Sequence, residues 1–166
     1  MTTGATLFSG GELAGVGMRA AGVTHLWGIE IDPEISAVAE ANGFHSITAD
    51  ILTVDPSTLP VPDMLHASPV CKNASQAKMA VDGIRETELD RDCGHKVAQF
   101  IDAMRPRVFT LENVYGYRKF DAFKIICAAL SRNGYMWDYD NLNVADFGVP
   151  QTRRRLVLRA SRGLLP

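Results

Sequence analysis

The sequence predicts an α/β fold, with a mostly parallel sheet, helices on both of its faces and an antiparallel strand near the C-terminus. Three observations support this prediction. Short apolar runs of strand length alternate with segments of helical period. A glycine-rich turn follows the first run, and acidic residues stand at the ends of the next ones, as in a nucleotide-binding βαβ unit.

The first strand–helix unit is indicated by the glycine-rich turn between its strand and its helix. Residues 3–8 are a strand candidate closed by Ser9-Gly10-Gly11, and a helix follows that ends at Gly22. One face of this helix carries Leu13, Val16, Gly17 and Ala20. The glycines allow a tight turn, and a helix N-terminus offers free N–H groups to an anion. Because the glycines do not spell GxGxxG, the turn alone identifies no ligand.

A second strand candidate, residues 25–32, ends in Glu30 and Asp32. An acid about 20 residues after the glycine turn binds a ribose hydroxyl in nucleotide-binding folds. We assign Glu30 to a ribose and Asp32 to the N-cap of the next helix, in which Pro33 suits the first turn. This helix runs to Gly43 through the positions Ile35, Val38, Ala39 and Asn42.

The middle of the chain contains the cysteine around which the site is organised. Residues 46–48 form a short strand followed by Asp50, and residues 53–62 form a proline-containing loop. The apolar run 63–67 then leads to Cys71. Residues just past such a strand face the ligand crevice of an open α/β sheet, where a thiol is a candidate nucleophile. A small buried core residue is the alternative reading of Cys71.

A long polar segment follows Cys71. Residues 72–95 have no clean period, which favours a lid or binding loop, with a disordered connector as the alternative. A helix face with Val97, Phe100, Ile101 and Met104 comes next. The clearest buried strand, residues 108–114, then carries Glu112 and Asn113. A charge there is costly unless it is paired or lies in a cleft.

The last part of the chain predicts one helix and two strands. The helix face consists of Phe123, Ile126, Cys127 and Leu130, with Cys127 in the core. Strands follow at residues 135–144 and 156–160, separated by a turn and by Arg153-Arg154-Arg155. Strand alternation places Arg153 and Arg155 on one side and Arg154 on the other, and a solvated edge is the alternative role for all three.

Composition and charge limit the class of protein. The chain has 166 residues, 46% of them hydrophobic, which is enough for one domain with its own core. No apolar run approaches the ~20 residues of a membrane span, and we see no signal peptide, so a cytoplasmic or nucleoid-associated protein is expected. Residues 1–68 carry a net charge of −7 and residues 69–166 a net charge of +5. The basic half suits a polyanion, although chance clustering gives the same pattern.

The cysteines and histidines predict no metal site. The three cysteines are odd in number and widely spaced, and no set of cysteines and histidines has the spacing of zinc ligands. Without an export signal, the cysteines are expected to be reduced intracellular thiols. The four histidines are interpreted as surface or structural residues.

Together these pieces resemble the catalytic domain of a C5-cytosine DNA methyltransferase. Six motifs of that family occur in the family order: residues 6–10 with Gly17, residues 28–33, residues 49–51, the Pro-Cys segment 68–75, the Glu-Asn-Val segment 111–114 and the Gln-x-Arg-x-Arg segment 147–155. The sequence departs from the usual motifs at Thr6, Glu12, Leu13, Val70, Lys72 and Ala74.

The resemblance implies a Rossmann-like S-adenosylmethionine-dependent methyltransferase fold over residues 1–166, with a cofactor half at about 1–68 and a catalytic half at about 69–166. It implies methyl transfer to carbon 5 of cytosine in DNA, of the kind found in restriction-modification, through a covalent adduct with Cys71. The implied catalytic residues are Cys71, Glu112, Asn113, Arg153 and Arg155. The implied residues for S-adenosyl-L-methionine are Phe8, Ser9, Gly10, Glu30, Ile31, Asp50 and Pro69.

Three other functions are alternatives to this one. An RNA cytosine methyltransferase would carry a similar motif set. A non-catalytic or incomplete subunit would need a second chain for target recognition, because the sequence stops about where a recognition domain would begin; we expect no robust sequence-specific methylation by this chain alone. An NAD-binding domain is disfavoured, since it leaves Cys71, Glu112 and the arginines unexplained.

Overall fold

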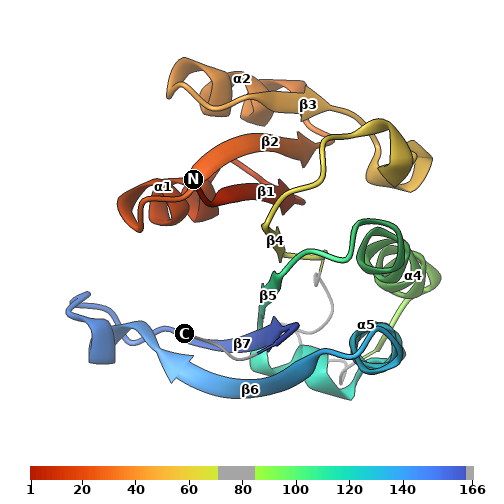
Figure 1. The fold of residues 1–166 in the computed structure, drawn as a ribbon. Helices are drawn as coiled ribbons and strands as arrows, with labels where there is room; N and C mark the ends of the chain where they lie inside the picture. Colours follow the sequence, from red (N-terminus) through yellow and green to blue (C-terminus); the bar gives the residue numbers. More distant parts are fainter. Residues whose placement is uncertain (71–84, 164–166) are drawn as a thin grey trace.

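The computed structural model describes residues 1–70 and 85–163, and within them seven strands form one sheet in the order β3-β2-β1-β4-β5-β7-β6 (Figure 1). The strands are β1 (Thr3–Leu7), β2 (Thr24–Glu30), β3 (Ser46–Thr48), β4 (Met64–Ala67), β5 (Val108–Asn113), β6 (Met136–Asn143) and β7 (Arg154–Ser161). The α-helices are α1 (Leu13–Ala20), α2 (Pro33–Ala41), α4 (Glu88–Met104) and α5 (Asp121–Arg132). Short 3₁₀ turns are η1 (Ile51–Thr53), η2 (Pro56–Thr58), η3 (Tyr115–Lys119) and η4 (Val144–Phe147).

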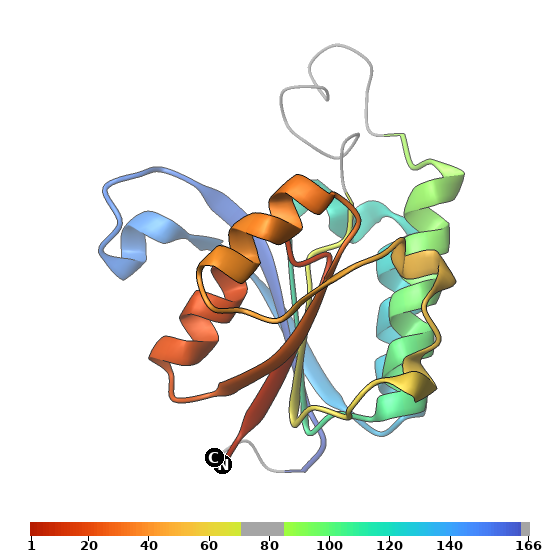
Figure 2. The same cartoon turned by 90° about the horizontal axis from the view of Figure 1, so that it is seen from above.

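The predicted fold class is confirmed. Strands β1 to β5 pair in parallel, whereas β7 is antiparallel to both β5 and β6. Helices α1 and α2 cover one face of the sheet, and α4 and α5 cover the other (Figure 2). Among the described residues, no helix combines the length and the apolar character needed to cross a membrane.

The main core lies between the sheet and the α4–α5 layer. Apolar side chains of the five central strands point into it and meet the buried faces of the two helices. Its large buried members include Leu7, Trp27, Leu65, Phe100, Phe109, Leu111, Ile126, Leu130 and Leu156. The two helices touch at Gly94, where a Cβ atom would lie 2.7 Å from the Cα of Ala122. Glycine there allows the helix axes to approach closely.

The opposite layer is built differently from what its apolar residues suggest. On α1, Gly15 and Met18 are buried, while Leu13 and Val16 are 85% and 51% exposed. Gly15 faces inward and packs closely: a Cβ atom at that position would lie 2.8 Å from the ring of Phe44. The apolar face of α1 noted in the sequence is therefore not the face that packs on the sheet.

Helix α4 begins earlier than the sequence pattern indicated. Residues 88–95, interpreted as part of the polar segment 72–95, form its first two turns. The cause is a capping box: the N–H of Thr87 donates to the Asp90 carboxylate at 2.8 Å, and the N–H of Asp90 donates to the Thr87 hydroxyl at 3.3 Å. The part of the loop prediction at residues 72–84 falls outside the described residues.

Two of the three cysteines belong to the core. Cys93 and Cys127 are free thiols that are 3% and 8% exposed. Burial raises the pKa of Cys93 to about 11, with help from nearby carboxylates, and that of Cys127 to about 12. Both therefore stay protonated at neutral pH, and the core role predicted for Cys127 is confirmed.

His66 makes the stability of the fold depend on pH. Its Nδ1 lies 2.8 Å from the Thr110 hydroxyl on the neighbouring strand, and burial lowers its pKa to about 4. The unfolded chain binds a proton at His66 below about pH 6.5, but the folded chain does so only near pH 4. We therefore expect the free energy of unfolding to fall by roughly 2 kcal/mol as the pH drops through this window.

The measurement is denaturant unfolding at pH 7 and at pH 4.5, for the wild type and His66→Gln. The variant lacks the titrating group, so its stability should decline less between the two pH values. An equal decline in both proteins would contradict the assignment of this pH dependence to His66.

Candidate functional site

The predicted site residues that the structure describes lie at one edge of the sheet. Strands β1 to β5 run in the same direction, so their carboxyl ends meet at that edge. The chain order turns between β1 and β4, with β2 and β3 on one side and β5 on the other. A ligand crevice forms at such a switch point in open α/β sheets.

The glycine turn after β1 is tied to the end of β2. Phe8 and Gly10 adopt left-handed backbone conformations with φ of 57° and 54°. The N–H of Ser9 donates to the carbonyl of Ile29 at 2.9 Å, and the N–H of Gly10 donates to the Glu30 carboxylate at 2.8 Å. The turn is thus held in one place before any ligand binds.

Glu30 has a structural task that the sequence did not reveal. Its second oxygen accepts the N–H of Asp32 at 2.9 Å, so both oxygens already accept backbone hydrogen bonds. Each oxygen keeps a further lone pair, and the carboxylate can still accept a hydroxyl group. Asp32 itself accepts the N–H groups of Glu34 and Ile35, which confirms its predicted role as the N-cap of α2.

Next to Glu30, an apolar side chain lies between carboxylates. Ile31 follows β2 and is 64% exposed, although most large apolar side chains of the sheet are buried. The N–H of Ala49 donates to the carbonyl of Glu30 at 2.9 Å, which brings the exposed Asp50 alongside. One oxygen of Asp50 accepts the N–H of Leu52 at 3.0 Å. An apolar surface flanked by carboxylate acceptors fits an adenosine group, with its flat ring, hydroxyls and amino group.

On the other side of the switch point, Glu112 binds two partners. Nε of Arg155 lies 2.8 Å from Oε1 of Glu112, and the Ser68 hydroxyl donates to Oε2 at 3.0 Å. Glu112 is the next-to-last residue of β5, Arg155 is the second residue of β7 and Ser68 follows β4. The carboxylate keeps 33% of its exposure, so solvent or a ligand can reach it.

Asn113 joins β5 to the segment that leads to Cys71. It is 2% exposed, its amide donates to the carbonyl of Pro69 at 3.0 Å, and its side-chain oxygen accepts the N–H of Val114 at 2.8 Å. Ser68 and Pro69 are thereby both held against the end of β5. Cys71 and Lys72 lie outside the described residues.

Arg153, Arg154 and Arg155 differ in exposure and in their contacts. Arg155 lies on the Glu112 side of β7, and Arg154, which precedes it on the strand, is exposed. The backbone N–H of Arg153 donates to Asn143 at 3.1 Å, but its exposed side chain has no hydrogen bond or ion pair with any residue the structure describes. The structure thus brings Arg155 to Glu112 and leaves Arg153 facing solvent.

No group of three or more potential metal ligands occurs in residues 1–70 and 85–163. The Glu112 contact of Ser68 was missed by sequence reasoning. Its signal was the place of Ser68, one residue after β4 at the level where β5 ends.

Comparison with known proteins decides the family. The profile of the C-5 cytosine-specific DNA methylases matches residues 2–165. The chain belongs to this family. Among curated methylases, it is 31% identical over 92% of its length to the type II methyltransferase M.NgoBI of Neisseria gonorrhoeae. It is 29% identical over the same share to M.HaeII of Haemophilus aegyptius.

Solved methyltransferase structures share the fold of this methylase-family chain. The Schizosaccharomyces pombe Dnmt2 methyltransferase superimposes with a TM-score of 0.78 over 99% of this chain and 51% of its own, at 18% identity. A putative DNA modification methyltransferase encoded in an Escherichia coli prophage gives 0.80 over 98% and 47%, also at 18% identity. The chain spans about half the length of the curated methylases it matches, 48% for each of the two named above.

Proposed function

We propose that this chain transfers a methyl group from S-adenosyl-L-methionine to carbon 5 of cytosine in DNA. The observation that carries the proposal is the arrangement at the ends of β4 and β5. There Glu112 contacts Arg155 and Ser68, and Asn113 holds Pro69, directly before the segment that contains Cys71. Family membership supports the same reaction.

Cys71 is the proposed nucleophile. Carbon 5 of cytosine is a poor nucleophile, but a thiolate that adds to carbon 6 forms a C–S bond and makes carbon 5 electron-rich. After methylation, loss of the proton on carbon 5 and departure of the thiolate restore the aromatic base. Cys93 and Cys127 are poor candidates, since burial raises their pKa values to about 11 and 12. A lysine at position 72 would favour the thiolate of its neighbour.

Glu112 and Arg155 would bind the cytosine ring. Addition of the thiolate places negative charge on the ring, which a protonated Glu112 would neutralise by donating to N3. Because the carboxylate pairs with Arg155 in the free protein, it must take up a proton when the base enters. Its remaining exposure gives solvent a route for that proton. Arg155 would then hold the base O2, with Arg153 as a further candidate, and Asn113 would keep the cysteine segment in position.

The cofactor is proposed to bind over the other half of the edge, so that residues of about 1–68 hold it and residues of about 69–166 carry the chemistry. S-adenosylmethionine supplies an electrophilic methyl group on a sulfonium. Phe8 and Ile31 would contact the adenine, Glu30 the ribose and Asp50 the adenine amino group. The turn residues Ser9 and Gly10, with Pro69, would border the rest.

DNA is the proposed partner. A cytosine inside a duplex must leave its stack to reach a thiol at this edge. The net charge of +5 over residues 69–166 and the exposed Arg153 and Arg154 support binding of a phosphate backbone. Because the chain covers about half of its relatives' length, recognition of a target sequence is assigned to a second chain or segment.

A trapping assay tests the function. The chain is incubated with labelled S-adenosylmethionine and a duplex carrying 5-fluorocytosine, whose fluorine cannot leave as a proton does. We expect a covalent, labelled protein–DNA complex that resists denaturing electrophoresis, and none with an unsubstituted duplex. The same duplex in RNA separates a DNA from an RNA enzyme. Absence of a complex with either nucleic acid, alone and with a recognition chain added, would refute the proposed activity.

A further inference from the structure

We propose that Glu12 is a positioning residue that holds the glycine turn, residues 8–11, against β1 and β2 and so preforms the cofactor site. The inference rests on the proposed function only in naming this turn as part of the cofactor site. The positioning itself follows from the contacts of Glu12, none of which involves a ligand.

The backbone of Glu12 is unusual for a residue with a long side chain. Glu12 lies directly after the turn as the N-cap residue of α1, and its φ of 62° and ψ of 37° are in the left-handed region. Few residues other than glycine adopt this conformation. Its N–H donates to the carbonyl of Ser9 at 3.0 Å, so the residue also closes the turn.

The side chain is held from two strands. One carboxylate oxygen, Oε1, accepts the hydroxyl of Thr6 at 2.5 Å and lies 3.0 Å from Nε2 of His25. Thr6 belongs to β1 and His25 to β2. Glu12 and Thr6 are fully buried, and the His25 side chain is 5% exposed. The end of the turn is thus tied to the two strands between which the cofactor edge begins.

Two glycines leave room for this carboxylate. A Cβ atom on Gly28 would lie 1.8 Å from Oε1 of Glu12, and one on Gly15 would lie 2.6 Å from Oε2. The strand register contributes as well. Gly4 pairs with His25 but Ala5 pairs with Trp27, and this shift turns His25 to the same side of the sheet as Gly28. Residues of α1 and β2, and the pairing of β2 with β1, therefore all accommodate the Glu12 side chain.

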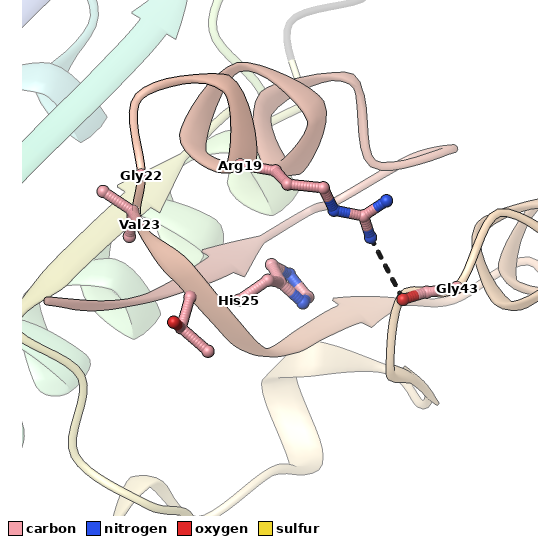
Figure 3. A pocket seen from close by; sticks show the side chains of 6 residues that line it. Arg19, Gly22, Val23, His25 and Gly43 are labelled. Carbon is pink, nitrogen blue, oxygen red and sulfur yellow. Dashed lines mark hydrogen bonds between the residues drawn. The ribbon is translucent and has the colours of Figure 1, made fainter. Parts of the chain in front are cut away.

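His25 separates this cluster from the surface. On its outer side is an open pocket of about 410 Å³, lined by Arg19, Gly22, Val23, Thr24, His25 and Gly43. Figure 3 shows the His25 ring beneath α1, with the Arg19 guanidinium above it reaching the carbonyl of Gly43 at 3.1 Å. The Thr6–Glu12–His25 contacts thus lie in the protein interior, where hydrogen bonds to a carboxylate are strong.

Stability alone does not account for this arrangement. Oε2 of Glu12 is buried and has no hydrogen-bond partner among the described residues, and an unpaired buried carboxylate oxygen is unfavourable. The left-handed backbone adds a further cost. The carboxylate instead fixes the position of the turn. Within the turn, Gly10 donates to Glu30, and just after the turn the Glu12 side chain contacts Thr6 and His25.

The test compares Glu12→Gly, Glu12→Gln and Thr6→Val with the wild type in two measurements. The first is the exchange rate of the Gly10 amide hydrogen in the ligand-free protein. The second is calorimetric affinity for S-adenosylhomocysteine. Glycine keeps the backbone conformation but removes the tie, so we expect exchange to accelerate and affinity to fall, each at least about tenfold. Glutamine keeps the acceptor oxygen and should stay within about threefold of the wild type; Thr6→Val should lie between.

Glu40→Gly is the matched control, because it places glycine at an exposed position of α2 and lowers stability without touching the turn. It should change neither measurement. Wild-type exchange and affinity in Glu12→Gly, or equal losses in Glu40→Gly, would overturn the inference. If the wild type fails to bind S-adenosylhomocysteine, the proposed function fails, and the exchange rates still decide the role of Glu12.

Discussion

Serine in place of Cys71 is expected to abolish the covalent complex with 5-fluorocytosine DNA and to lower methyl transfer at least about a thousandfold. Serine keeps the size of the side chain, but its hydroxyl does not ionise near neutral pH, whereas a thiol with a pKa near 8.5 does so readily. The measurement is single-turnover methylation with labelled cofactor, together with electrophoresis of the trapped complex.

Cys127→Ala is the control for that experiment. Cys127 is a buried thiol on the inner face of α5, so its loss removes a cysteine without removing a reactive one. The control should retain the trapped complex. A complex that persists in Cys71→Ser, or disappears in Cys127→Ala while the protein remains folded, would assign the adduct to a different residue.

Glutamine in place of Glu112 is expected to slow methyl transfer by about 10²- to 10³-fold, the usual contribution of a general acid. The amide oxygen can still accept from Arg155, and the amide nitrogen can donate to the Ser68 hydroxyl oxygen, so the geometry at the ends of β4 and β5 should be retained. What the variant lacks is a proton to give to N3 of the base. The measurement is the single-turnover rate of methylation, compared between the variant and the wild type.

Asp140→Asn provides a matched control. Asp140 on β6 also pairs with an arginine on β7, Arg159, but this pair lies away from the candidate site. Its removal should leave the rate within about twofold, as is usual for an exposed ion pair. If Glu112→Gln behaves like Asp140→Asn, then Glu112 only orients Arg155 and the acid must be sought elsewhere.

The parallel strands and the helices on both faces of the sheet were predictable because they follow local rules. Each parallel strand is a short apolar run, and each is followed by a turn or a polar group at the same edge. The start of α4 was missed because its first turn is polar, although Thr87 and Asp90 form a capping box that the sequence contains. The packing face of α1 could not be predicted from hydrophobicity, because it includes Gly15, which lies against the side chains of Glu12 and Phe44.

Some features of the candidate site were likewise predictable from the sequence, and others were not. Glu30, Asp50 and Glu112 were recognisable because each stands at a strand end, which is a property of the local sequence. Contacts between elements could not be recognised from the sequence, because they depend on strand order and register. The Ser68–Glu112 hydrogen bond, for example, requires β4 to lie beside β5. The burial of Glu12 needs a register shift between β1 and β2, of which the chain carries no local sign.

The antiparallel strand has a consequence for how the site is assembled during synthesis. Among the strands that the structure describes, β7 comes after β6 in the chain, yet it lies between β5 and β6 in the sheet. Until it inserts, β5 is an open edge, and unpaired edges invite association with other chains. The strand that closes this edge also carries Arg155 to Glu112. Pairing of β7 therefore protects the sheet edge and completes the charged pair in one step.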